Sequence, residues 1–346
     1  MFRGLSVVRR RPGSKSLTAL AAVAGLALAA WLILHVGAPA IGAGLQSAGW
    51  TGLWAITGFH LIATALMGLA WWRLRRAGTR SAFIWGRLVR DAGSEILPLS
   101  QIGGCLLGAR AVTTQGVAAT TAGATMLVDA TLEFGAQIVY IALGLALLVW
   151  QLPEAPLTVP LLAAGGILAA GVGLLVLVRG RGLPQWLSQW PRVARVKLAY
   201  AERLAEFKRE VATIYRGQRT LWPSFLLHLA AWLLSGAEAW LALRFMGAHF
   251  SLATVLALEA QVYAIRSFAF LIPSAIGFQE GAYVLASTAL GLPPDLALGL
   301  SLLKRARDVT LAVPALLSWQ LVETRRGWRR QVAAPADPAA RPGGDD

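Results

Sequence analysis

The chain has 346 residues, of which 56% are hydrophobic and 14% charged, and its mean hydropathy is +0.59. Soluble globular domains carry about 25% charged residues, so the composition excludes an ordinary soluble protein and indicates a membrane protein. The net charge of +15 would also suit a nucleic-acid-binding protein. However, the basic residues gather in connections beside apolar runs and form no aromatic-interleaved patch, so no nucleic-acid partner is expected.

Six segments of the chain are apolar and long enough to cross about 30 Å of hydrocarbon as helices. In chain order they are residues 17–36, 50–72, 117–150, 157–178, 222–245 and 296–322. The first follows a basic segment, residues 1–16, and is interpreted as a retained span because it is longer than a signal-peptide core. We therefore predict a single transmembrane domain over residues 17–322. Residues 323–346 are expected to form a cytoplasmic tail that is basic at first and then disordered.

Lysine and arginine are concentrated in alternate connections. Residues 1–16 hold five, residues 73–80 four, residues 179–219 ten and residues 325–330 four, whereas residues 37–49, 151–156, 247–251 and 291–295 hold none. The positive-inside rule then places both termini in the cytoplasm. Tryptophans at the ends of the crossings support this orientation. Trp50 and Trp150 are predicted at the outer interface, and Trp71, Trp72, Trp222 and Trp319 at the inner one.

Two apolar segments, residues 83–111 and 252–291, remain once the six crossings have fixed the alternation. Each is interrupted by a proline, Pro98 or Pro273, with an Ile-Gly pair a few residues later. Because each segment must begin and end on one side, we predict two re-entrant helical hairpins that enter from opposite faces as inverted repeats. Non-helical backbone at this depth is tolerated only in protein or beside a wet cavity, and paired broken helices indicate a transport site. The alternative is that both prolines merely kink packed helices.

The basic loop of residues 179–219 contains an amphipathic pattern over residues 195–216. Its apolar positions recur at helical steps and are Leu198, Ala201, Leu204, Phe207, Val211 and Ile214. Such a helix suits the inner leaflet, with its cations facing anionic lipid headgroups. A solvated bridging helix is an equally good interpretation.

Ionisable residues within the apolar segments cost about 2.5–3.5 kcal/mol each near the bilayer centre, so each needs a reason. The candidates for a polar path are Asp129, Glu133, Glu238 and Glu280, with Arg90, Arg110, Arg266 and Arg305 as counter-charges or headgroup contacts. Glu95 and the turn residues Pro98, Gly103, Gly104, Pro273 and Gly277 complete the set. For single charges, neutralising i,i+4 pairs such as Arg87–Asp91 and Lys304–Asp308 are the simpler explanation. Because both signs gather around the two hairpins, the group as a whole favours a polar cavity.

Signatures of catalysis and of cofactor binding are lacking. Cys105 is the sole cysteine, which excludes an intrachain disulfide, and the four histidines are too widely spaced for a zinc motif. No phosphate-binding Gly-rich loop, HExxH pair or Gly-x-Ser-x-Gly elbow occurs. We therefore expect no cofactor and no metal, assign no catalytic residue, and do not expect an enzyme.

Two motifs resemble a known family. Pro273, Ile276, Gly277 and Glu280, followed by Gly291-Leu292 and Arg305, resemble the transmembrane domain of lysylphosphatidylglycerol synthases, within a wider family of lipid-flippase-like membrane proteins. The run WGRLVRDAGSEILPLSQIGGCLLGARAV, residues 85–112, followed by the helix with Asp129 and Glu133, is more narrowly similar to hopanoid-biosynthesis-associated membrane proteins of that family. The likeness covers about residues 17–322.

The resemblance implies a multi-pass protein of the bacterial inner membrane with two re-entrant regions, which handles a lipid. The leading hypothesis is a translocase, or its accessory, for a hopanoid-type or modified lipid, with lipid-biosynthesis or export proteins as partners. Lysyl transfer is not expected, because the sequence includes nothing like the large cytoplasmic domain that performs it in full synthases. The second motif also reads Pro-Ser-Ala-Ile-Gly where many relatives have a Gly-rich turn. An intramembrane enzyme that modifies lipid headgroups and a scaffold for lipid-synthesis enzymes are the alternatives.

Overall fold

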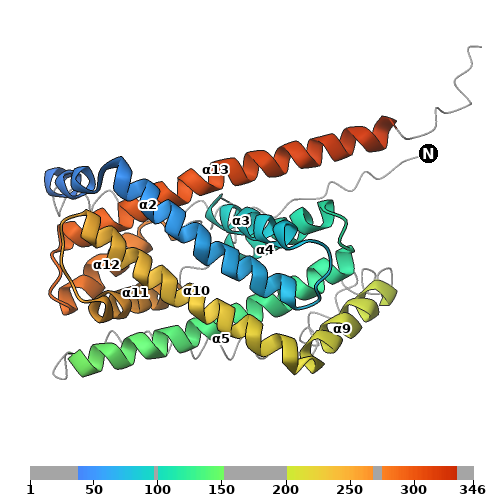
Figure 1. The fold of residues 1–346 in the computed structure, drawn as a ribbon, viewed down its shortest axis with the longest axis horizontal. Coiled ribbons are helices and arrows are strands. Elements are labelled where there is room, and N and C mark those ends of the chain that lie inside the picture. Colours follow the sequence, from blue (N-terminus) through green and yellow to red (C-terminus); the bar gives the residue numbers. More distant parts are fainter. Residues whose placement is uncertain (1–37, 97–99, 152–200, 268–274, 333–346) are drawn as a thin grey trace, which may run out of the picture.

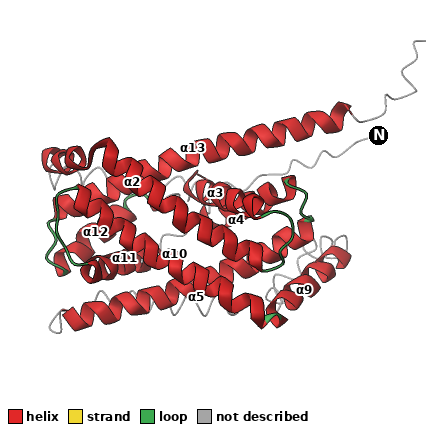
Figure 2. Ribbon diagram, viewed as in Figure 1, coloured by secondary structure: helices red, strands yellow, loops and turns green. Residues whose placement is uncertain are grey.

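The computed structural model describes residues 38–96, 100–151, 201–267 and 275–332, and the regular elements in these ranges are helices (Figure 2). In the first half of the chain they are α2 (Ala38–Arg73), α3 (Arg80–Ile96), α4 (Ser100–Thr114) and α5 (Ala119–Gln151). In the second half they are α9 (Ala201–Arg216), α10 (Gln218–Phe245), α11 (Leu252–Arg266), α12 (Phe278–Ala289) and α13 (Pro294–Val332). The all-helical class expected from the sequence is confirmed for this part of the chain.

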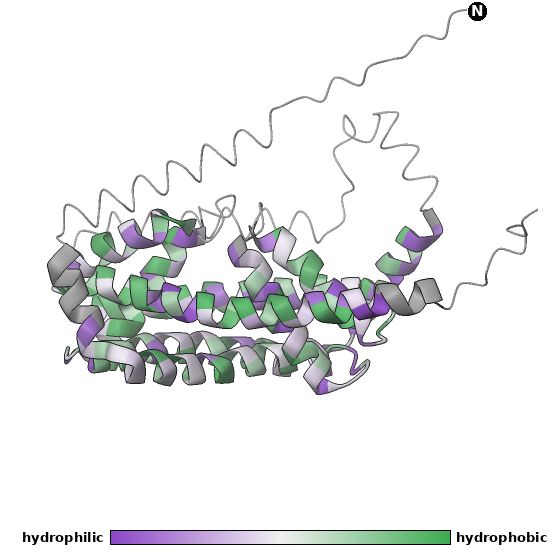
Figure 3. Cartoon of the chain, turned by 90° about the horizontal axis from the view of Figure 1, so that it is seen from above, coloured by the Kyte–Doolittle hydropathy of each residue, from purple (hydrophilic) through white to green (hydrophobic). Residues whose placement is uncertain are grey.

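Three of the described helices are long and apolar enough to cross a membrane: α2 from Gln46 to Arg73, α5 and α10. α10 packs against both α2 and α5, so the three form the centre of the bundle (Figure 1). They correspond to the crossings predicted at 50–72, 117–150 and 222–245, whereas those predicted at 17–36 and 157–178 lie outside the described residues. The sixth, 296–322, falls within α13. Hydrophilic residues recur along α13 rather than only at its ends, so it lacks the apolar character of the other three (Figure 3).

Helices α3 and α4 form an antiparallel pair with very close backbone contact. A methyl group on Gly104 would lie 2.1 Å from Ser94 Oγ and 2.5 Å from the Arg90 carbonyl oxygen. Farther along, a methyl group on Gly108 would lie 2.7 Å from Arg90 Cβ. Only hydrogen at these α4 positions permits the approach, so the glycines let α4 lie directly against Arg90 and Ser94 of α3.

A second pair, α11 and α12, packs against α13 and α10 near the other end of the bundle. Figure 1 shows α3 and α4 in one half of the bundle's length and α11 and α12 in the other. α3 has 17 residues, about 26 Å of helix, against 33 residues, about 50 Å, for α5. Each pair thus extends along only part of the length of the bundle. The turns predicted at Pro98 and Pro273 lie outside the described residues.

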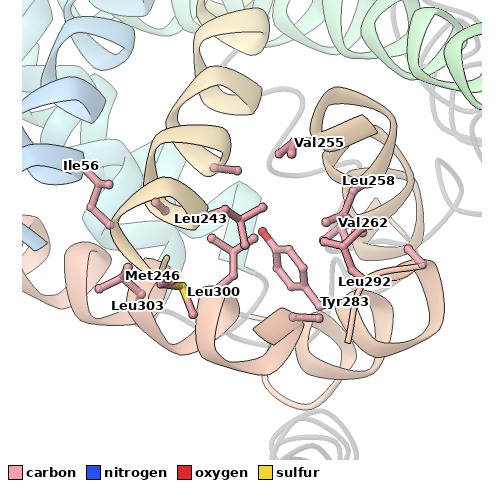
Figure 4. Packing of buried hydrophobic residues seen from close by; sticks show 14 of the residues in the cluster. Ile56, Leu243, Met246, Val255, Leu258, Val262, Tyr283, Leu292, Leu300 and Leu303 are labelled. Atoms are coloured by element: carbon pink, nitrogen blue, oxygen red, sulfur yellow. The ribbon is translucent and has the colours of Figure 1, made fainter. Parts of the chain in front are cut away.

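The apolar core between α2, α10, α11, α12 and α13 contains Tyr283, which is 1% exposed. Its ring lies among Leu243, Leu258, Val262 and Leu300 (Figure 4). The outer surface is apolar too: on α13 the residues Val309, Val313, Leu317 and Leu321 follow one another at four-residue steps and are 50–62% exposed. An outward apolar stripe of this kind suits contact with lipid chains.

Two predictions about surface residues need correction. Trp71 was expected at the membrane interface, but it is fully buried and donates a hydrogen bond to Thr125 Oγ1 over 3.0 Å. α9 was expected either on the leaflet or as a solvated bridge. Instead its apolar residues Phe207, Val211 and Ile214 pack against the end of the bundle beside α5. In both cases a protein neighbour covers apolar surface that the local pattern assigned to lipid or water.

Basic residues gather at one end of the bundle. Arg73 at the end of α2, Arg80 at the start of α3, Arg216 and Arg219 between α9 and α10, and Arg326 on α13 lie there (Figure 1). Arg326 donates a hydrogen bond to the carbonyl oxygen of Thr113 at the end of α4. The loops at the opposite end, 247–251 and 291–293, contain no lysine or arginine.

Candidate functional site

A cavity of about 170 Å³ lies among α2, α3, α4, α5, α10, α11 and α13. Four arginines and four carboxylates line it, namely Arg87, Arg90, Arg266, Arg307, Asp91, Glu95, Glu133 and Asp308. His60, Ser94, Gln101 and Ser235 add further polar groups. The space is large enough for several waters. A charged cavity of this size within apolar helices is the leading candidate for a functional site.

The α3 side of the cavity is held by an ion network with α5. Arg87 donates to both oxygens of Glu133, over 2.8 and 2.7 Å, and through Nε to Asp91 over 2.9 Å. Arg90 binds Glu133 over 2.8 Å and Asp129 over 3.1 Å. Asp129 and Glu133 lie one turn apart on α5, as their spacing predicts, and this is why two arginines of α3 reach them together.

A histidine also contacts this network. His228 Nε2 on α10 lies 2.9 Å from Asp129 Oδ1, and both side chains are fully buried. His228 Nδ1 has no hydrogen-bond partner among the described residues. Asp129 therefore joins three helices, α3 through Arg90, α5 through its own backbone and α10 through His228.

A second network closes the α13 side. Arg307 bonds Glu238 of α10 through one guanidinium nitrogen, and it contacts Asp308 over 2.5 and 3.0 Å through two others. His60 Nδ1 on α2 lies 2.8 Å from the other oxygen of Glu238. Glu238 is completely buried, and Arg307 lines the cavity in front of it.

A third network lies deeper, toward α12. Lys304 Nζ is 2.5 Å from Glu259 Oε2, and the Tyr283 hydroxyl donates to the other oxygen of Glu259. The i,i+4 pair of Lys304 with Asp308 that the spacing suggested is wrong: Asp308 binds Arg307 beside it. Lys304 binds Glu259 on another helix, because charges attract more strongly away from water than on an exposed helix surface.

The second family motif forms a compact lock at the start of α12. Glu280 accepts a hydrogen bond from the backbone N–H of Gly277 over 2.8 Å, and Arg305 donates to both of its carboxylate oxygens. Gly277 has φ 80°, in the left-handed region where glycine is favoured. Glu280 and Arg305 do not line the cavity, so their visible role is to join the start of α12 to α13.

Comparison with known families supplies the remaining observation. The model of the lysylphosphatidylglycerol synthase TM region matches residues 18–317. The chain belongs to this family. The family match and the apolar helices identify a membrane protein with a membrane-lipid-related function. No curated protein and no solved structure matches the chain.

The structure divides the residues that were selected from the sequence of this lysylphosphatidylglycerol synthase TM region into groups with different positions. The cavity is lined by Arg90, Glu95, Glu133 and Arg266. Asp129 and Glu238 do not line it but bind arginines that do. Gly104 acts through helix packing, and Gly103 lies beside it on α4. Glu280, Gly277 and Arg305 form the separate lock, and Arg110 pairs with Glu323 where both are partly exposed. Pro98 and Pro273 lie outside the described residues.

Several residues that line the cavity of this lysylphosphatidylglycerol synthase TM region were not selected as candidates from the sequence. Arg87 and Asp91 do form the expected i,i+4 pair, yet Arg87 also binds Glu133 and lines the cavity. Arg307 was not selected, and Asp308 was considered only as a neutralising partner of Lys304. The clearest available signal was their position in mid-helix. His60 carried no signal, since a lone histidine in an apolar segment looks like core.

Proposed function

We propose that this chain is a lipid translocase, which accepts the polar headgroup of a membrane lipid in the charged cavity while the apolar body stays in the bilayer. One observation carries the proposal: four arginines and four carboxylates from α3, α5, α11 and α13 surround one cavity. Charged groups within a membrane are costly and mark paths for polar cargo. An apolar bundle gains nothing from such a cavity unless something polar enters it.

Size supports a division between headgroup and body. A volume of about 170 Å³ has room for a small polar group with several waters. Acyl chains or a fused polycyclic ring system exceed it and remain outside, against apolar side chains such as Val313 and Leu317. The cargo we propose is a hopanoid-type or otherwise modified lipid, because residues 85–112 are similar to hopanoid-associated proteins.

The helix arrangement suggests how access alternates. α3–α4 and α11–α12 occupy opposite halves of the bundle, as expected for two re-entrant hairpins that enter from opposite faces. Rocking of one half against the other would open the cavity to each leaflet in turn. The network of Glu238 joins α2 to α10 and α13, helices from both halves of the chain, so this carboxylate holds contacts that such rocking would rearrange. Both termini are proposed to face the cytoplasm.

Reconstitution in liposomes tests the function. Vesicles with the full chain should exchange labelled lipids between leaflets faster than empty vesicles, and Glu133→Gln should slow this exchange. Glu210→Gln, in a pair with Arg75 at the surface outside the cavity, is the matched control and should exchange like wild type. Exchange no faster than in empty vesicles for several lipid classes would refute the translocase.

The same vesicles separate the alternatives. A lipid-modifying enzyme predicts a new lipid species by mass spectrometry. A scaffold predicts that Glu133→Gln leaves lipid synthesis in cells unchanged while vesicle exchange is absent for every variant.

A further inference from the structure

Three of the four arginines that line the cavity are already occupied by carboxylates of the chain. Arg87 binds Asp91 and Glu133. Arg90 binds Asp129 and Glu133, and Arg307 binds Glu238 and Asp308. A ligand anion would have to compete at each of these with two carboxylates of the chain, of which at least one is largely buried, and this is costly.

Arg266 differs from the other three. It is the last residue of α11 and lines the cavity, yet it makes no ion pair and donates no hydrogen bond to any residue that the structure describes. Its contact is with the ring of Tyr263, whose centroid lies 5.7 Å from the guanidinium carbon. The stretch from 267 to 277 contains no acidic residue that could serve as its partner.

Longer-range charges keep Arg266 in place without occupying its donors. Glu95 and Asp308 interact with it electrostatically, and both line the same cavity. Asp308 already accepts two hydrogen bonds from Arg307. The guanidinium of Arg266 is therefore near acidic groups, but among the described residues none accepts a hydrogen bond from it, and it lines the cavity.

We infer that Arg266 is the docking cation for an anionic, phosphate-bearing lipid headgroup. A guanidinium presents its donors in a planar fork that matches two phosphate oxygens, and such charge-assisted bonds are short and strong. A partly buried cation without a hydrogen-bonded partner carries an unfavourable energy that a bound anion relieves. This inference rests on the proposed function, since it names the headgroup chemistry that the translocation cavity accepts.

Binding to the detergent-solubilised full chain tests the inference apart from transport. The probes are phosphatidylglycerol and phosphatidate, with diacylglycerol as the neutral lipid and glycerol 3-phosphate as the soluble phosphate. We expect both phospholipids to bind, and Arg266→Gln to weaken them about tenfold or more, as expected for loss of a charge-assisted hydrogen bond. Arg75→Gln, which alters an exposed pair with Glu210 outside the cavity, should bind like wild type.

Several results would overturn the inference. Unchanged phospholipid binding by Arg266→Gln would do so, and so would diacylglycerol binding the unaltered chain as tightly as phosphatidate. The latter comparison needs no variant and stands even if Arg266→Gln does not fold. Glycerol 3-phosphate binding as tightly as phosphatidate would assign the site to soluble phosphates instead. Failure of the proposed function looks different: phospholipids bind through Arg266, but the wild-type chain exchanges none in vesicles.

Discussion

His60 on α2 and Glu238 on α10 are hydrogen-bonded over 2.8 Å, although 178 residues separate them in the chain. Arg307 on α13 completes this contact from the other side of the carboxylate. A second histidine, His228, makes the corresponding contact with Asp129 in the first half of the bundle. Each histidine therefore contacts a buried carboxylate that also binds an arginine of the cavity. Two contacts of the same chemistry join helices from opposite halves of the chain.

Glu238→Gln should destabilise the protein by about 1–3 kcal/mol, because Arg307 and His60 lose a buried charged partner. Denaturant unfolding in mixed micelles measures the change. The same substitution at Glu210, whose partner Arg75 is 38% exposed, should cost less than about 1 kcal/mol. Equal losses at both positions would contradict the importance of burial.

Lys304→Met should destabilise by about 3–5 kcal/mol, since it leaves Glu259 charged and buried without its cation. Adding Glu259→Gln to this variant should restore part of the loss, because the amide stays a hydrogen-bond acceptor for Tyr283 and carries no charge. A double-mutant cycle measures the coupling. Additive losses would mean that the two side chains do not interact.

Gly104→Ala should separate α3 from α4 and cost about 1–3 kcal/mol, because its methyl group would overlap Ser94 and the backbone of Arg90. The displaced α3 should also slow lipid exchange in vesicles. Gly58 on α2 has open space where a methyl group would lie, so Gly58→Ala should leave exchange unchanged and gain up to about 1 kcal/mol. Similar behaviour of the two variants would argue against close packing of the hairpin.

Single cysteines should distinguish the wet cavity from the lipid-facing surface. With Cys105 replaced by Ser, a cysteine at Gln101, which lines the cavity, should react with a membrane-impermeant thiol reagent in vesicles. A cysteine at Leu317, on the outer apolar stripe, should stay unlabelled. Labelling is read by mass shift. A protected position 101 would place this part of the cavity out of reach of water.

Local patterns predicted much of the fold. The long apolar stretches of α5 and α10 exceed the thickness of hydrocarbon, so each specifies a helix that crosses it. Two interrupted segments likewise specify two broken helix pairs. The four-residue spacing of Asp129 and Glu133 predicted that they share one face of α5. In the structure both of them bind Arg90 of α3. These features follow from helix geometry alone, which is a property of neighbouring residues.

Tertiary structure alone decided which charges meet. Lys304 and Asp308 share a helix face, yet Lys304 binds the buried Glu259 on α11 and Asp308 binds Arg307 beside it on α13. The roles of His60 and Arg307 depend on contacts between segments far apart in the chain. Arg266 differs from the other lining arginines because it forms no ion pair with an acidic residue in the described part of the chain. Sequence spacing determines which side chains share a helix face, but the packing of one helix on another determines which partners that face meets away from water.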